Sequence, residues 1–240
     1  MKPLRISYTS PVPGARRVRR FSSPGFTLTE LIVAIGLIAI LVAIIIPAIN
    51  DALVNSRNSR CINNLRGLGL AMKQYLGEHR GVGPPNYGGA MGNGTYLWTG
   101  YLAPYLGVEV TPTTPLSTIF DCPIDADSKQ RPSGRTYVSI AASWSISYGY
   151  NFQYVGESGV EPRVNLNTIA QPSMLILFAD APGLTEGGSL YCLIDCINNI
   201  PSRTASQRHR KGFNAVFADG HVQWMPYTST VNNGQYWRPQ

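Results

Sequence analysis

The chain has 240 residues, a length that suits one membrane element and one globular domain. Its formal net charge is +7, but six of its 20 Lys and Arg residues lie before Phe26. Without those six, 14 basic residues face 13 acidic ones, which argues against a nucleic-acid-binding protein. Only 14% of residues are charged, while Gly, Pro and Tyr number 24, 18 and 13, so the composition favours a loop-rich extracytoplasmic β domain over a cytosolic helical enzyme.

Residues 1–25 form a basic leader to which we assign no fold. It contains no acidic residue, and its positive side chains predict that this end stays in the cytoplasm while the chain beyond the apolar run is exported. These side chains are Lys2, Arg5, Arg16, Arg17, Arg19 and Arg20.

An apolar run follows the leader. It extends from Leu31 to Ile49, 19 residues, which as a helix would be about 28 Å long and would span a hydrocarbon core of about 30 Å. Twelve of the sixteen residues from Leu31 to Ile46 are Leu, Ile or Val, and they favour insertion by roughly 4 to 7 kcal/mol. Glu30, at the edge of the run, opposes insertion by no more than about 3 kcal/mol. We therefore expect a transmembrane helix over residues 26–49 with one unexplained carboxylate.

The stretch PGFTLTELIVAIGLIAILVAIIIPAI resembles the N-terminus of a type IV prepilin or a type II secretion pseudopilin. The resemblance implies that prepilin peptidase cuts between Gly25 and Phe26 and that the new amine of Phe26 is methylated. It also implies that Glu30 neutralises the amine of a neighbouring subunit during assembly, since a buried charge is tolerable only when paired. An ordinary signal peptide is the plainer alternative, but it would have a shorter apolar core and a small-residue cut site after it.

The same resemblance gives partners and a location. The partners would be prepilin peptidase, other pilin-like subunits through the N-terminal helix, and the inner membrane, with no nucleic acid. The protein would be single-pass, with its N-terminus cytoplasmic and its head domain extracytoplasmic, or part of an extracellular filament after assembly.

Residues 50–80 continue the helix in amphipathic form. Apolar residues recur at spacings of three, four and seven, which predicts one face packed on a sheet. This stripe consists of Val54, Cys61, Leu65, Leu68, Met72 and Tyr75, widened by Ile62 and Leu76. Pro47 predicts a kink or local unwinding near the outer membrane boundary. Residues 81–240 form the β-rich head, so the fold class is α+β and pilin-like, a long N-terminal helix packed on an antiparallel sheet.

A second resemblance involves CINNLRGLGLAMKQYLGEHRGVGPPN, which is similar to the prepilin-like family called DUF1559. The H-X9-DG element formed by His209, Asp219 and Gly220 belongs to the same pattern, and Ser147–Asn151 and Phe178–Asp180 look like its internal motifs. Gly67 and Gly69 are unusual inside a helix, at about 1 kcal/mol each relative to Ala. Close packing on a strand and local kinking both explain them.

Two loop segments suggest sites. YLWTGYLAPYLG, with Trp98, Tyr101, Leu102 and Tyr105 at helical spacing, predicts a short helix or turn whose aromatic residues are core, with a sugar-binding platform as the alternative. IFDCPIDAD offers Asp121, Asp125 and Asp127 as weak calcium ligands. The spacing is not that of an EF-hand, so a solvated acidic turn is the favoured interpretation, and no cofactor is assigned.

Strands are expected over Thr136–Ile140, Ile146–Phe152 and Met174–Phe178, and over Asn214–Phe217 and His221–Met225. Asp219-Gly220 predicts a type I′ hairpin between the last two, the first of which alternates as a half-buried strand does. His209 and Asp219 would be about 33 Å apart on a straight strand. We therefore expect Asp219 and Gly220 to make a turn and His209 to cap or hydrogen-bond a neighbouring loop. No catalytic motif accompanies them, so no catalytic residue is assigned.

Four cysteines, Cys61, Cys122, Cys192 and Cys196, can form disulfides in an extracytoplasmic domain. Cys192 with Cys196 and Cys61 with Cys122 is one of three pairings, and the sequence does not select among them. Zinc is disfavoured because there is no second CxxC-like pair. The basic group Arg203, Arg208, Arg210 and Lys211 suggests either DNA contact or, more simply, a solvated loop.

Together these features predict a non-enzymatic prepilin-like subunit of a type IV pilus or type II secretion pseudopilus. The alternative is a membrane-tethered module that binds sugar, calcium or DNA and does not polymerise.

Overall fold

The computed structural model describes most of the apolar helix and most of the head core. The described residues are 25–85, 87–91, 94–111, 113–125, 135–137, 146–151, 155, 164–181, 193–194, 196–197, 200–201, 208–230 and 234–237. The chain divides into two compact units, Met1–Ala48 and Ile49–Gln240. We describe each unit separately and call the second one the head.

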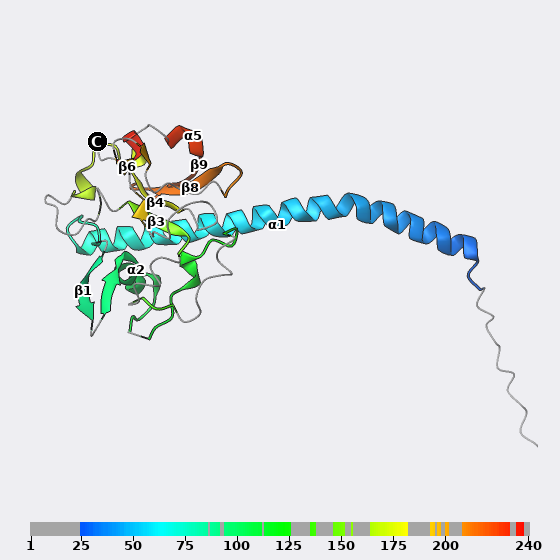
Figure 1. The fold of residues 1–240 in the computed structure, drawn as a ribbon, viewed down its shortest axis with the longest axis horizontal. Coiled ribbons are helices and arrows are strands. Elements are labelled where there is room, and N and C mark those ends of the chain that lie inside the picture. The colour runs from blue at the N-terminus through cyan, green and yellow to red at the C-terminus, as the bar shows by residue number, and fades with distance from the viewer. Residues whose placement is uncertain are drawn as a thin grey trace, which may run out of the picture. The chain divides into compact units, whose positions relative to one another are not determined.

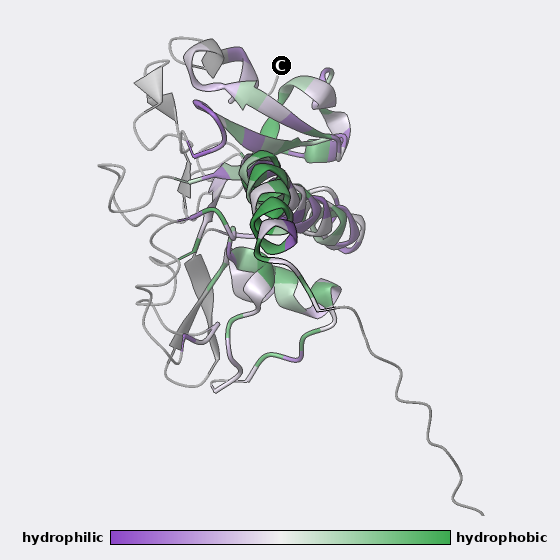
Figure 2. Ribbon diagram, turned by 90° about the vertical axis from the view of Figure 1, so that its right-hand side faces the viewer, coloured by the Kyte–Doolittle hydropathy of each residue, from purple (hydrophilic) through white to green (hydrophobic). Residues whose placement is uncertain are grey.

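Helix α1, Leu28–Glu78, is the longest element (Figure 1). In its first half the side chains are apolar on all sides, and the large ones between Leu31 and Ile46 are 45–68% exposed. Figure 2 shows this half coloured as hydrophobic on every face. The helix continues without a break through Pro47, so the expectation of local unwinding there is wrong, while the alternative of a kink stays a prediction. A proline removes a single N–H from the hydrogen-bond ladder, and the remaining bonds keep the turns on both sides helical.

Within the head, α1 buries one face. Its buried residues are Cys61, Leu65, Leu68, Gly69, Ala71, Met72, Tyr75 and Leu76. These confirm most of the predicted stripe. Val54 is wrong, because it is 41% exposed, and Ile62 is only partly buried. The buried face therefore begins at Cys61, two turns later than the apolar spacing indicated.

Gly69 explains how closely α1 approaches the sheet. A Cβ built on Gly69 would lie 2.8 Å from Cγ2 of Val216, and one on Gly67 would lie 2.8 Å from Cδ1 of Ile119. Such distances are too short for ordinary contacts, so the absence of side chains at both positions permits close packing. This supports close packing rather than kinking as the role of the two glycines.

The central sheet has five strands in the order β5-β3-β4-β8-β9. Strands β3, β4, β8 and β9 pair antiparallel, and the short β5 pairs parallel to β3. The α+β fold, with a long helix on an antiparallel sheet, is confirmed. The bounds are β3 Tyr148–Asn151, β4 Ile176–Asp180, β5 Leu193–Ile194, β8 Gly212–Phe217 and β9 Val222–Pro226. Two separate hairpins are β1 Tyr87–Met91 with β2 Gly94–Leu97, and β6 Cys196–Ile197 with β7 Ile200–Pro201.

Strand β8 is buried on both faces, so the expectation of a half-buried strand is wrong. Val216 belongs to the core cluster that contains α1. Phe213, Ala215 and Phe217 belong to a second cluster with Trp237. Trp237 near the C-terminus thus covers one face of β8. The alternation of residues along the strand had predicted that one of its faces would be exposed to solvent.

The aromatic segment forms α2, Trp98–Leu102, followed by the 3-10 helix Ala103–Leu106, which confirms the predicted short helix. Trp98 is fully buried and packs against Phe120, Tyr150 and Phe178. The core assignment is therefore confirmed for Trp98, and this ring cannot serve as an exposed sugar platform. Of the strand expected over Thr136–Ile140, Thr136 forms an isolated bridge with Pro115, and residues 138–140 lie outside the described residues.

The β8–β9 connection is a hairpin, but not of the predicted type. Phe217 N–H donates to the carbonyl of His221, and Gly220 alone in the loop has positive φ, at 93°. A type I′ turn needs positive φ at two central residues, so the loop is of the three-residue kind that ends in a left-handed glycine. Asp219 has no positive φ, and its Oδ1 accepts from His221 N–H at 3.0 Å.

Candidate functional site

The start of α1 carries the residues assigned to processing and assembly. Gly25 and Phe26 precede the helix, and Phe26 is 80% exposed. Glu30 accepts hydrogen bonds from Thr27 N–H at 2.9 Å and from Thr27 Oγ1 at 2.7 Å, while Thr27 Oγ1 accepts from Glu30 N–H at 3.2 Å. This reciprocal pattern is a capping box. Sequence reasoning gave Glu30 an intermolecular role and missed this local one, although T-x-x-E before an apolar run is its signature.

The apolar half of α1 has the length and composition needed to cross a bilayer, and its apolar residues are not buried in the structure. So many exposed apolar side chains require a non-aqueous environment, either lipid or other helices.

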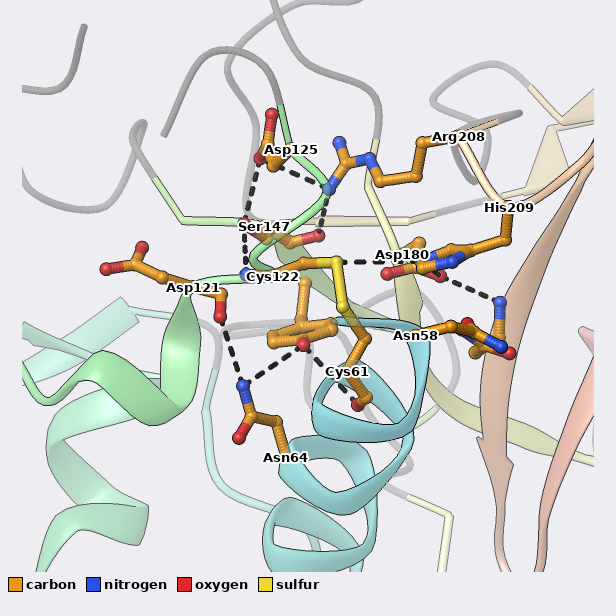
Figure 3. The surroundings of a disulfide bond; sticks show 12 residues. Asn58, Cys61, Asn64, Asp121, Cys122, Asp125, Ser147, Asp180, Arg208 and His209 are labelled. Carbon is orange, nitrogen blue, oxygen red and sulfur yellow. Dashed lines mark hydrogen bonds and ion pairs between the residues drawn. A yellow bond between two sulfur atoms is a disulfide. The ribbon is translucent and has the colours of Figure 1, made fainter. Parts of the chain in front are cut away.

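In the head, a disulfide joins Cys61 of α1 to Cys122 in the loop before the sheet (Figure 3). Both cysteines are fully buried. This pair is one of those that the sequence left open, and it closes a loop with a sequence separation of 61. Cys192 and the side chain of Cys196 lie outside the described residues.

Polar contacts lock both ends of this disulfide. Tyr148 OH donates to the carbonyl of Cys61 at 3.4 Å, and Asn64 Nδ2 donates to the carbonyl of Asp121 at 3.0 Å. On the other side, Cys122 N–H donates to Ser147 Oγ at 2.7 Å. Burial raises the pKa of Tyr148 well above its ordinary value, so the phenol stays a neutral donor.

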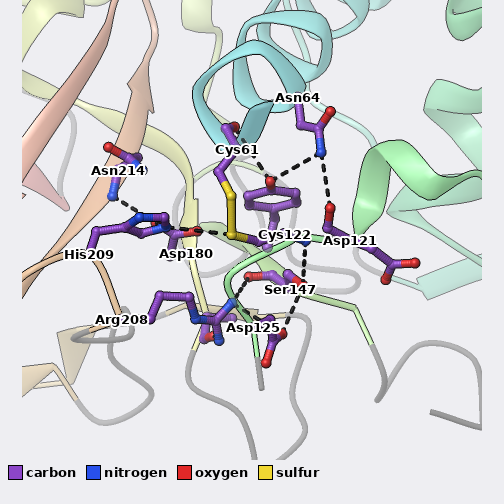
Figure 4. A network of polar contacts seen from close by, with 12 residues as sticks. Cys61, Asn64, Asp121, Cys122, Asp125, Ser147, Asp180, Arg208, His209 and Asn214 are labelled. Carbon is purple, nitrogen blue, oxygen red and sulfur yellow. Dashed lines mark hydrogen bonds and ion pairs between the residues drawn. A yellow bond between two sulfur atoms is a disulfide. The ribbon is translucent and has the colours of Figure 1, made fainter. Parts of the chain in front are cut away.

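Two ion pairs or hydrogen-bonded pairs lie beside the disulfide. Arg208 Nη1 is 3.1 Å from Asp125 Oδ2, with both side chains 3% exposed. His209 Nε2 is 3.1 Å from Asp180 Oδ2 and 3.5 Å from Cys122 Sγ. Figure 4 shows these groups converging from separate segments of the chain. Buried charges need such partners, because an unpaired one is strongly destabilising.

The three segments that resembled internal family motifs therefore meet at one place. Ser147 precedes β3 and Tyr148 begins it, Asp180 ends β4, and His209 precedes β8. Asp180 Oδ2 also accepts from Asn214 N–H at 2.7 Å, which fixes the carboxylate between the two strands. Sequence reasoning noted the motifs but missed the roles of Asp180, Ser147 and the Asp125–Arg208 pair, since no local spacing signals contacts between such distant segments.

His209 and Asp219 do not pair with each other. His209 faces Asp180, whereas Asp219 contacts His221 Nδ1 at 2.6 Å and accepts from Lys73 Nζ through its carbonyl. Partial burial favours a higher pKa for the Asp219 carboxyl, but hydrogen bonds from His221 and the positive charges of His221 and Lys73 outweigh it, so this pKa is lowered. The structure thus places the H-X9-DG residues at opposite ends of β8.

The two described calcium candidates are separately engaged by arginines. Asp121 forms a bidentate pair with Arg135, at 2.7 and 3.1 Å. Asp125 is buried against Arg208 and also accepts from Ser147 Oγ at 2.8 Å. The expected solvated acidic turn is therefore wrong for Asp125, and the expected solvated basic loop is wrong for Arg208. Asp127 lies outside the described residues, as does Arg203 of the basic group.

Cys61, Cys122 and His209 form the one described group whose ligand atoms come close enough to hold a metal, all within 4.8 Å. Both sulfur atoms are bonded to each other, so a thiolate metal site at this position would require reduction of the disulfide. The disulfide and its hydrogen bonds have a structural role, because they connect α1, β3, β4 and β8 around one covalent link.

The comparisons with known proteins bear on the N-terminal segment. Residues 20–46 match the family model described as the prokaryotic N-terminal methylation motif. No curated protein and no solved structure matches the chain. The motif includes Gly25, Phe26 and Glu30 and supports a prepilin-like protein anchored by an apolar N-terminal helix.

Proposed function

We propose that this prepilin-like chain is a non-enzymatic structural subunit, cut between Gly25 and Phe26 and methylated on the Phe26 amine. Its α1 helices then pack together in a type IV pilus or a type II secretion pseudopilus. The observation that carries the proposal is the methylation motif over residues 20–46, continuous with a helix whose apolar side chains have no partners among the described residues. Prepilin peptidase, the inner membrane and other pilin-like subunits are the partners this implies.

The capping box refines the part that Glu30 plays. In the isolated chain its carboxylate is engaged by Thr27 at the positive end of the α1 dipole. In a filament the amine of a neighbouring subunit would compete for that carboxylate. A test of assembly must therefore separate loss of charge from loss of the helix cap.

Glu30→Gln makes that separation, because Gln serves in a capping box but carries no charge. We expect Glu30→Gln to insert into the membrane normally and to fail to form filaments, measured by membrane fractionation and by electron microscopy of sheared filaments. Thr27→Ala is the matched control, since it removes the cap and keeps the charge. Assembly of Glu30→Gln at the wild-type level would overturn the filament role and leave the alternative of a membrane-tethered binding module.

Processing is tested separately by mass spectrometry of the N-terminus. A mature chain that starts at N-methyl-Phe26 is the expected result. A chain that keeps Met1 would show that the helix serves only as an anchor.

A further inference from the structure

The head contains a cavity of about 390 Å³ close to the start of its helix. Val54, Asn55 and Asn58 of α1 form one wall, and Trp224 and the segment 208–210 form another. All of these residues belong to the unit Ile49–Gln240. The walls combine two amides, cationic side chains and an indole, and none of the described lining residues carries a carboxylate.

A strained turn places cationic side chains at this cavity. Arg210 and Lys211 both have positive φ, at 54° and 66°, and His209 and Gly212 exchange two backbone hydrogen bonds across them. This is the φ pattern of a type I′ turn, which normally selects Asn or Gly. Bulky residues are strained in this backbone conformation, and such strain is concentrated at functional sites. We call residues 209–212 the basic turn.

The charges of the basic turn are not neutralised within the described head. Arg208 is offset by Asp125, but neither Arg210 nor Lys211 forms an ion pair with a described acidic side chain. Both are exposed. The guanidinium of Arg210 reaches Asn55 Oδ1 at 3.5 Å, which keeps it over the cavity.

Contacts with α1 give the position of the basic turn along the helix. Arg210 contacts Asn55, and further along β8 Asn214 contacts Asn58 at 3.0 Å. At the far end of the strand, the carbonyl of Asp219 contacts Lys73. Of these three contacts, the one made by the basic turn lies nearest to the N-terminal end of α1.

That level lies close to the polar surface of a bilayer. Asn55 follows Ile49, the end of the apolar run, by six residues, or about 9 Å of helix. The headgroup layer beyond each face of the hydrocarbon core is roughly 5–7 Å thick, so on an upright helix Asn55 lies just beyond that layer, where long Arg and Lys side chains can still reach the phosphates. Trp224, which is 44% exposed, stands beside the turn and donates from Nε1 to the carbonyl of His209 at 2.8 Å. Tryptophan is enriched at this depth of a membrane, where its ring is partly apolar and its N–H is satisfied.

We propose that the basic turn and its cavity bind the phosphate of an anionic phospholipid headgroup, and that this contact holds the head against the membrane before assembly. Arg210 offers paired donors that match two phosphate oxygens, Lys211 adds a point charge, and Asn55 and Asn58 offer amides. Trp224 lies in the interface beside them. The inference rests on the proposed membrane anchoring but not on filament formation.

The test uses the full chain, one copy per nanodisc, with a quencher attached to the lipid headgroups. The fluorescence of Trp224 is obtained as the difference between the emission of wild type and that of Trp224→Phe. We expect it to be quenched in discs containing phosphatidylglycerol and not in discs of phosphatidylcholine alone. In the double variant Arg210→Gln/Lys211→Gln the ratio of docked to undocked heads should fall about 30-fold, since each basic residue near an anionic surface contributes about fivefold. Lys73→Gln, a cation at the far end of β8, is the matched control and should behave as wild type.

Equal quenching of Trp224 in the two lipids overturns the proposal. This comparison uses the wild-type fold, so its outcome does not depend on whether a variant folds. Quenching that persists in the double variant also overturns it. Inorganic phosphate at constant ionic strength should leave the quenching unchanged; if it abolishes the quenching, the cavity is a site for free phosphate and the headgroup assignment is wrong. A chain that docks in nanodiscs but never forms filaments would separate this result from failure of the proposed function.

Discussion

At the scale of single residues, polar side chains in the head form pairs that cannot be predicted from the sequence. His209 and Asp219 belong to one short motif, yet they do not contact each other. His209 contacts Asp180 at the end of β4, and Asp219 contacts His221 just after the turn. The motif therefore secures two ends of β8 separately. Its histidine holds the neighbouring strand, and its aspartate organises the turn.

Asp219 gives the head a component of stability that depends on pH. Its pKa is lowered in the folded chain, so its contribution is present above the unfolded pKa of about 4 and is lost as the pH falls through the lower folded value. We expect Asp219→Asn to lower the melting temperature of the full chain in detergent at pH 5–7 and to match wild type at the acidic end of the series. The difference should be small, because partly exposed pairs contribute about 0.2–1 kcal/mol. The same difference between the two proteins at every pH would contradict this assignment.

At the scale of elements, the contact of α1 with β8 depends on the absence of a side chain at Gly69. The sequence predicted the buried stripe of α1 from its spacing, and most of that stripe is confirmed because helical periodicity is a local property. The prediction failed at Val54, because the point at which the head begins to cover the helix is decided by segments far away in the chain, such as Cys122 at a sequence separation of 61 from Cys61. The burial of both faces of β8 was missed for the same reason, because Trp237 arrives from the C-terminus.

Gly69→Ala tests this packing. The added Cβ would lie 2.8 Å from Val216 Cγ2, and the stiff valine has little freedom to yield. We expect a loss of about 1–3 kcal/mol in the free energy of unfolding, measured by urea titration in detergent. Gly77→Ala is the matched control, since nothing lies within 4 Å of its Cβ, and it should stabilise the helix by up to about 1 kcal/mol.

A double-mutant cycle compares Gly69→Ala, Val216→Ala and the double variant Gly69→Ala/Val216→Ala. If the loss arises from this contact, part of it should be recovered when valine is shortened. Equal stabilisation by Gly69→Ala and Gly77→Ala would show that the helix does not press on β8 at this point.

At the scale of the whole molecule, the sequence predicted the α+β class and the N-terminal methylation motif, because a span and a junction are local patterns. It did not select a disulfide pairing, and it did not predict that Ser147, Asp180 and His209 would meet beside Cys122. Such convergence depends on the register of β3, β4 and β8, and single-sequence patterns do not contain that information. The N-terminal half of the site is therefore readable from the sequence, and the clamp in the head is not.

The disulfide should be the largest single contribution to the stability of the head. We expect Cys61→Ser/Cys122→Ser to lose about 2–5 kcal/mol in the free energy of unfolding, since the bond closes a long loop. Thermal unfolding with and without a phosphine reductant measures this loss. The reductant should lower the melting temperature of wild type and of a Cys192→Ser/Cys196→Ser variant, but not that of Cys61→Ser/Cys122→Ser. An equal response of all three proteins would place the stabilising bond elsewhere.

The position of Cys61 also determines how the head bears mechanical load. Cys61 is the first buried residue of α1 after the apolar run, and the side chains that pack without covalent links, from Leu65 to Leu76, all follow it. Tension transmitted along the helix from its N-terminal half therefore reaches a covalent bond before it reaches any of the packed face. The helix cannot be peeled from the sheet one turn at a time, and a pull is shared between the Cys122 loop and the strands hydrogen-bonded around it. In a subunit that is held only by its helix, this makes the first buried contact of the head with that helix a covalent one.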